Sequence, residues 1–148
     1  MRESTQHAGG GREGRRAPLY NRFVVMILTS PLHALLDGGL TVVRFRGRRT
    51  GRMLSTPVEY VRVGERVIVL VANAPAKQWW KNVRANPEVG VVLRVAPRTG
   101  RATVGRPRDA DMADDLRHYL ARKPRSAAVA ARESSVIVRI DLDPAATR

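Results

Sequence analysis

The sequence contains no cysteine among its 148 residues. Disulfide bonds, a thiolate nucleophile and a zinc site built on cysteine are therefore excluded, and this absence is typical of a reducing cytoplasm. Aromatic residues are also scarce, at 5% of the chain, so the adjacent Trp79 and Trp80 stand out. The three histidines, His7, His33 and His118, share no metal-ligand spacing with one another or with an acid. We therefore expect no bound metal.

Acidic residues are few, with 13 Asp and Glu against 27 Lys and Arg, so the formal net charge is +14. A cationic chain attracts polyanions: nucleic acid, acidic membranes, or a small ligand that carries phosphates or carboxylates. Proteins that read nucleic acid usually interleave exposed aromatic residues or present a basic helix. Neither pattern occurs here, so we expect no specific nucleic-acid partner.

No apolar run reaches the ~20 residues that span a bilayer. The most apolar segment, residues 22–36, is interrupted by Pro31 and lacks a clean signal-peptide cleavage site, which favours a cytoplasmic protein. Helical spacing of apolar residues predicts a helix over residues 19–36. Arginines beside this helix leave open a peripheral contact with an anionic membrane. Residues 1–17 are polar, Gly-rich and basic, and are expected to form a flexible tail.

The rest of the chain, which we treat with the helix as one domain over residues 18–148, is dominated by short β-like segments. Strands are predicted over residues 40–46, 55–63, 66–73, 88–95, 101–107 and 134–142, with a turn at 97–100. Helices are predicted over residues 74–87 and 109–123, and a further helical piece over 125–132. Six short strands joined mostly by hairpins indicate an α+β, mainly β domain built on a small antiparallel barrel.

The first predicted hairpin carries an unusual concentration of positive charge. Five arginines fall within nine positions with no acid among them: Arg44, Arg46, Arg48, Arg49 and Arg52. Guanidinium groups match phosphate and carboxylate oxygens in paired geometry, and Gly47 and Gly51 let backbone N–H groups approach an anion. The turn is thus either an anion cradle or a solvated hairpin of an Arg-rich chain.

The segment "QWWKN" (residues 78–82) combines a flat aromatic surface with a polar amide. Adjacent residues on a helix point about 100° apart, so one tryptophan can pack in the core while the other lines a cleft. Asn82 shares a helix face with Trp79, which suits a heteroaromatic ligand, although it could instead cap the helix. Ala72 and Asn73, at a strand end, would let a planar ligand lie nearby.

Three segments in the same order resemble the deazaflavin-dependent nitroreductase and quinone reductase family of actinobacteria: "GRRTGRMLSTPVEY" (47–60), "GERVIVLVAN" (64–73) and "WWKNVRANPEVGV" (79–91). The resemblance covers residues 20–142. It implies a split β-barrel related to flavin-nucleotide-binding oxidoreductases, which here would have six antiparallel strands, an N-terminal helix and short flanking helices. It also implies coenzyme F-420, a deazaflavin that carries hydride and bears a tail with a phosphodiester and several glutamates.

The resemblance assigns cofactor-binding roles to three groups of residues. The residues that would meet the phosphate and glutamates are Arg48, Arg49, Thr50, Gly51 and Arg52. The residues that would line the bend toward the ring are Ser55, Thr56, Pro57 and Val58. The residues that would surround the ring are Val71, Ala72, Asn73, Trp79 and Asn82. No side chain is expected to be an obligate catalytic acid or base, because the cofactor carries the chemistry and solvent supplies the proton.

Several functions stay open at this point. The leading hypothesis is an oxidoreductase that passes a hydride from reduced F-420 to a quinone, nitroarene or enone. Alternatives are an FMN-binding or lipid-binding barrel without efficient turnover, and a basic nucleic-acid binder. FMN has one phosphate and no glutamates, so the length of the basic turn favours the deazaflavin. The chain is expected to be a monomer or a homodimer.

Overall fold

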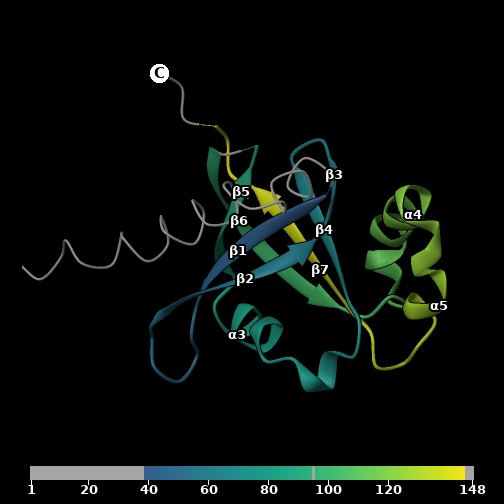
Figure 1. The fold of residues 1–148 in the computed structure, drawn as a ribbon, viewed down its shortest axis with the longest axis horizontal. Helices are drawn as coiled ribbons and strands as arrows, with labels where there is room; N and C mark the ends of the chain where they lie inside the picture. The colour runs from purple at the N-terminus through teal and green to yellow at the C-terminus, as the bar shows by residue number, and fades with distance from the viewer. Residues whose placement is uncertain (1–38, 95, 146–148) are drawn as a thin grey trace, which may run out of the picture.

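The computed structural model describes residues 39–94 and 96–145, which form a curled antiparallel sheet with helices around it (Figure 1). The strands are β1 (Leu40–Arg46), β2 (Met53–Glu59), β3 (Val61–Val63), β4 (Arg66–Val71), β5 (Glu88–Leu93), β6 (Ala96–Gly105) and β7 (Val136–Leu142). Their order in the sheet is β2-β1-β5-β6-β7-β4-β3. The predicted mainly β fold is confirmed, with seven strands instead of six. The expected tail and the helix over 19–36 lie outside the described residues.

The additional strand arises because the predicted strand 55–63 changes partner at Tyr60. β2 pairs with β1 at one edge of the sheet, whereas β3 pairs with β4 at the opposite edge. Between them the backbone N–H of Tyr60 donates to the carbonyl of Gly39 at 2.7 Å. One chain segment therefore contributes both edge strands, which curls the sheet into a split barrel. Pro57 lies in edge strand β2, as expected for a residue without an N–H to donate.

The predicted turn at residues 97–100 is wrong. Pro97 and Gly100 lie within β6 and pair with Val92 and Val89 of β5. The chain reverses earlier, where Arg94 has a φ of 47°. Gly100 allows β6 and β7 to approach closely, because a Cβ added there would lie 2.7 Å from the carbonyl oxygen of Asp141 in β7. The Pro and Gly that suggested a turn are thus accommodated by strand packing.

The helices are short. They are the 3-10 turns η2 (Ala74–Ala76), η3 (Ala110–Met112) and η4 (Pro124–Ser126), and the α-helices α3 (Trp79–Ala85), α4 (Ala113–Arg122) and α5 (Ala127–Ala130). The predicted helix over 74–87 is not continuous, since Lys77 is extended (φ −111°, ψ 139°) and separates η2 from α3. The predicted helical regions 109–123 and 125–132 are confirmed as η3 with α4 and η4 with α5. No described helix is long and apolar enough to cross a membrane.

Two apolar clusters hold these elements together. The larger fills the barrel with alternate residues of the strands and is closed at one end by α3, which contributes Trp80 and Val83. The smaller lies outside the barrel, where Met112 and Tyr119 pack on Ile68 and Ile137 of β4 and β7. This second cluster places α4 and α5 on the opposite side of the sheet from the first hairpin (Figure 1).

An ion-pair network around a buried acid fastens α4 to the sheet. Asp115 is 1% exposed, and its two carboxylate oxygens each lie 3.0 Å from a guanidinium, that of Arg66 in β4 and that of Arg139 in β7. Arg66 also lies 2.9 Å from Asp141. Asp141 also lies 3.6 Å from Arg139, so the two acids and the two arginines of this network compensate one another.

Candidate functional site

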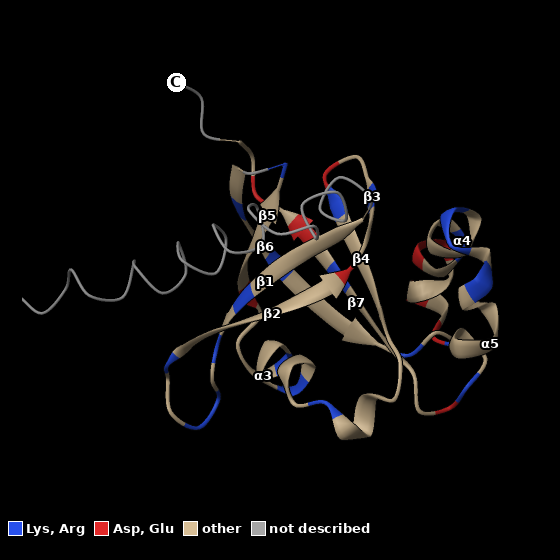
Figure 2. Ribbon diagram, in the orientation of Figure 1, with Lys and Arg blue, Asp and Glu red and all other residues tan. Residues whose placement is uncertain are grey.

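Residues 47–52, which we call the arginine loop, connect β1 to β2 and project beyond the sheet (Figure 2). The loop is closed by two backbone hydrogen bonds, from Gly47 N to Arg52 O at 2.7 Å and from Gly51 N to Gly47 O at 2.9 Å. Gly51 has a φ of 68°, a conformation that side chains with a Cβ rarely adopt. Arg46 donates from its guanidinium to the Gly51 carbonyl at 2.8 Å. The loop therefore has a defined backbone, and Arg48, Arg49 and Arg52 on it are exposed.

Helix α3 holds the arginine loop in place through Asn82. The side-chain oxygen of Asn82 accepts from the Arg48 backbone N–H at 3.0 Å and from the Arg48 guanidinium at 3.1 Å. The same guanidinium also donates to the side chain of Gln78 at 3.3 Å. Asn82 is only 9% exposed, and its nitrogen donates to the Gln78 carbonyl at 3.2 Å. Asn82 thus orients the loop, a role that sequence reasoning missed because the two residues are 34 positions apart.

A pocket of about 570 Å³ opens beside this loop, between β2 and β4. We call it the edge pocket. Six residues predicted to bind the cofactor line it: Thr56, Pro57, Val58, Val71, Ala72 and Trp79. The other lining residues are Glu59, Val69, Leu70, Lys77 and Gln78. Gln78 both lines the pocket and accepts from Arg48, so the pocket and the arginine loop are contiguous.

The edge pocket exists because the barrel is split here. β3 pairs with β4 only as far as Ile68, so among the described strands none pairs with residues 69–71 on the side away from β7. β2 likewise pairs only with β1 within the described part of the chain. Open strand edges present backbone N–H and C=O groups, which can bond the edge of a planar heteroaromatic ring.

The two tryptophans separate as adjacent helical positions should. Trp80 is 9% exposed, belongs to the barrel core and donates from its indole N–H to the Ala74 carbonyl at 2.7 Å. Trp79 is half-buried and lines the edge pocket. Its ring centroid lies 6.5 Å from that of Phe45, with the planes tilted by 45°. Phe45 therefore supports Trp79 from the core side, which leaves Trp79 as an aromatic wall of the pocket.

Of the nine residues predicted to line the bend or surround the ring, three do not line the edge pocket: Ser55, Asn73 and Asn82, the last of which contacts the arginine loop. Ser55 is exposed in β2. Asn73 is exposed and adopts a left-handed conformation (φ 50°, ψ 49°) at the start of η2, which Asn tolerates better than most residues. Thr50 stays on the loop, where its hydroxyl accepts from the Arg52 backbone N–H at 3.3 Å. Lys77 and Gln78 line the pocket instead, and no sequence signal singled out either residue.

Perturbed ionisable groups lie elsewhere in the described structure. Hydrogen bonds from Arg98 and Arg62 lower the pKa of Glu65, and burial raises the pKa of Tyr119. Neither residue lines the edge pocket. The described residues also contain no group of three or more His, Asp or Glu side chains that could hold a metal. The pocket offers shape, an aromatic wall and adjacent positive charge, which suits the binding and orientation of a cofactor.

The family sequence model described as F420H(2)-dependent quinone reductase matches residues 13–142. The chain belongs to this family. The match confirms the resemblance recognised from the arginine loop and the tryptophan helix, and it supports an F-420-dependent reductase activity. A comparison with curated proteins gave no match.

Solved structures share the split-barrel fold of this family member. An F420-H2 dependent reductase, FDR-A, superposes with a TM-score of 0.54 at 17% identity, over 71% of this chain and 94% of that one. A heme binding protein from Mycobacterium smegmatis gives a TM-score of 0.56 at 12% identity, over 71% of this chain but only 46% of that one. The heme storage protein HutZ from Vibrio cholerae gives 0.55 at 13% identity, over 77% and 89%. At these identities the similarity shows the fold alone.

Proposed function

We propose that this protein transfers a hydride from reduced coenzyme F-420 to an electron-poor acceptor, with quinones as the main class and nitroarenes and enones as alternatives. The observation that carries the proposal is the contiguity of the arginine loop and the edge pocket through Gln78. A cofactor with a planar ring and a polyanionic tail needs these two surfaces side by side. Family membership points to the same coenzyme.

The residues present fit both halves of this coenzyme. The edge pocket, at about 570 Å³, falls within the ~300–1,000 Å³ of small-molecule sites and has the aromatic wall of Trp79. On the loop, Arg49 and Arg52 are exposed, and no acid lies between residues 44 and 52. Guanidinium groups bind phosphate and carboxylate oxygens in pairs, so the loop suits a phosphodiester followed by glutamates.

In this proposal the cofactor carries out the chemistry, and the protein binds and orients it. When bound, the reduced deazaflavin supplies the hydride. The chain binds the tail at the arginine loop, which Asn82 holds ready, and orients the ring between the strand edges and Trp79. Orientation of two reactants converts an encounter in solution into a reaction within one complex. Water supplies the proton, because the pocket opens to solvent.

FMN binding is the nearest alternative within the same pocket. FMN carries one phosphate, and the exposed cations Arg48, Arg49 and Arg52 exceed what one phosphate requires. The number of cations on the loop therefore favours the coenzyme with the longer anionic tail.

Turnover separates an enzyme from a barrel that only binds its cofactor. The purified chain would be mixed with reduced F-420 and with one of three acceptors: a soluble naphthoquinone, a nitroarene or an enone. Oxidation of the coenzyme would be followed by its absorbance. We expect protein-dependent oxidation, fastest with the quinone and reduced in Trp79→Ala. Arg84→Ala, on the outer side of the same helix, is the matched control. Oxidation no faster than without protein, for all three acceptors, would leave a binding protein only.

A further inference from the structure

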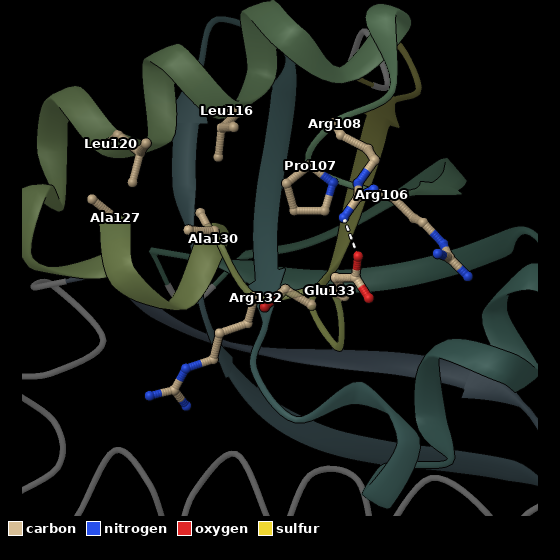
Figure 3. A pocket seen from close by; sticks show the side chains of 11 residues that line it. Arg106, Pro107, Arg108, Leu116, Leu120, Ala127, Ala130, Arg132 and Glu133 are labelled. Carbon is tan, nitrogen blue, oxygen red and sulfur yellow. Dashed lines mark hydrogen bonds and ion pairs between the residues drawn. The ribbon is translucent and has the colours of Figure 1, made fainter.

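We propose a second ligand site, for a small amphipathic anion, in a hollow between α4, α5 and the segment after β6 (Figure 3). The hollow has a volume of about 420 Å³, within the range of small-molecule sites. It shares no lining residue with the edge pocket, and it lies on the side of the sheet that carries α4. The inference is independent of the proposed hydride transfer.

The walls of the hollow are apolar. Leu116 and Leu120 lie one turn apart on α4 and are half-buried at the margin of the cluster around Tyr119. Opposite them the chain offers only small side chains, including Ala127 and Ala130. Figure 3 shows the leucines, these alanines and a proline of the segment after β6 arranged around one space. The volume between these walls leaves room for an apolar body between α4 and α5.

The rim of the hollow is cationic. It carries Arg106, Arg108 and Arg132 against a single acid, Glu133, a formal charge of three minus one, or +2. Glu133 lies 3.2 Å from the Arg108 guanidinium, so its charge is already matched (Figure 3). Within the described part of the chain, the guanidinium groups of Arg106 and Arg132 form no ion pair or side-chain hydrogen bond. Figure 3 shows both guanidinium groups turned outward from the hollow, so each of these long side chains must rotate toward the mouth to contact an incoming anion.

This combination selects one class of ligand. Transfer of an apolar body from water to the leucine and alanine walls is favourable. A carboxylate at the mouth can form ion pairs with the two arginines. A neutral molecule of the same length lacks the second contribution, and a cation is repelled. A polyanion such as nucleic acid gains nothing from walls without polar groups. The geometry therefore points to a compact carboxylate with an aliphatic or aromatic body.

The test uses octanoate as the probe and isothermal titration calorimetry on the full chain. Octan-1-ol and octyltrimethylammonium carry the same chain with no charge and with positive charge. We expect octanoate to bind one site per chain, at least about tenfold more tightly than either comparison compound. Equal binding of the three compounds, or no binding of octanoate, would overturn the proposal.

Variants locate the site. Ala127→Leu fills the hollow from an exposed position and should abolish binding of octanoate. The double change Arg106→Gln with Arg132→Gln should weaken binding about fivefold or more, with a smaller dependence on salt. Arg122→Gln with Arg125→Gln removes the same charge from exposed residues outside the hollow and is the matched control.

Thermal unfolding of each variant checks that the fold is intact. The double change of the rim arginines keeps the proposal testable even if the Ala127 variant folds poorly. Equal weakening in the rim and control pairs would show nonspecific attraction to a basic protein. Unchanged binding in a folded Ala127→Leu variant would place the ligand elsewhere. Either result would refute the site.

Discussion

Replacement of Asn82 by alanine should loosen the arginine loop without removing any of its charge. The Asn82 oxygen accepts two hydrogen bonds from Arg48, at 3.0 Å from the backbone N–H and 3.1 Å from the guanidinium. A neutral hydrogen bond contributes about 0.5–1.5 kcal/mol net and one to a charged group about 1.5–3 kcal/mol. Arg48 is exposed, so water replaces part of this loss. We expect about 1–2 kcal/mol of loop ordering to be lost.

This loss should appear in cofactor affinity, because the coenzyme must then order the loop when it binds. At 1.4 kcal/mol for each factor of ten, the affinity for F-420 should fall about tenfold in Asn82→Ala. Fluorescence titration measures this change. The deazaflavin ring without its phosphodiester and glutamates should bind with nearly the same affinity to both proteins.

The controls separate loop order from charge. Asn82→Asp keeps the acceptor oxygens for Arg48 but adds a negative charge beside the loop, so it should weaken F-420 binding while the loop stays anchored. Arg84→Ala removes an exposed cation of the same helix and should have little effect. Unchanged F-420 affinity in a folded Asn82→Ala protein would refute the idea that α3 preorganises the loop.

Two further predictions concern stability. Asp115→Ala removes the carboxylate that Arg66 and Arg139 share, although both arginines keep Asp141 as a neighbour. It should lower the free energy of unfolding by about 1.5–3 kcal/mol in urea titrations, and a loss below about 1 kcal/mol would contradict the role of this network. Hydrogen bonds, first from Arg98 and then from Arg62, lower the pKa of Glu65 in the folded protein. The ionised carboxylate therefore stabilises the fold above pH 4.5, and this stabilisation is lost as the pH falls through the folded-state pKa. Glu65→Gln should therefore be less stable than the wild type at pH 7, and the difference in their free energies of unfolding should shrink below pH 4.5. A difference that does not change with pH would contradict the stabilising role of the Glu65 carboxylate.

The edge pocket illustrates what the sequence could predict. Its residues from β2, β4 and α3 come from three segments that resemble a known family, and six of the predicted residues line one pocket. Helical geometry predicts that the two tryptophans face different ways, and the family resemblance selects Trp79 as the one at the ring. Their roles in binding F-420 stay predictions until the titrations are made.

The interactions that organise the site could not be read from local patterns. The bond between Arg48 and Asn82 joins residues 34 positions apart, so no periodicity reveals it. The exchange of partners at Tyr60 was also hidden, because the strand-like pattern continues through that residue. At Gly100 the local composition suggested a turn, but the close approach of Asp141 requires a glycine within a strand. Each of these features depends on long-range packing.

The central claim is that the arginine loop binds the anionic tail of F-420. The most direct measurement compares the affinities for F-420, for its ring without the tail, and for FMN, by fluorescence titration of the wild type and of Arg49→Gln with Arg52→Gln. We predict that F-420 binds at least about tenfold more tightly than the other two, and that the double variant loses this preference. Arg122→Gln with Arg125→Gln should keep it. Equal affinity for F-420 and the tail-free ring, or a preference that survives in the loop variant, would contradict the account.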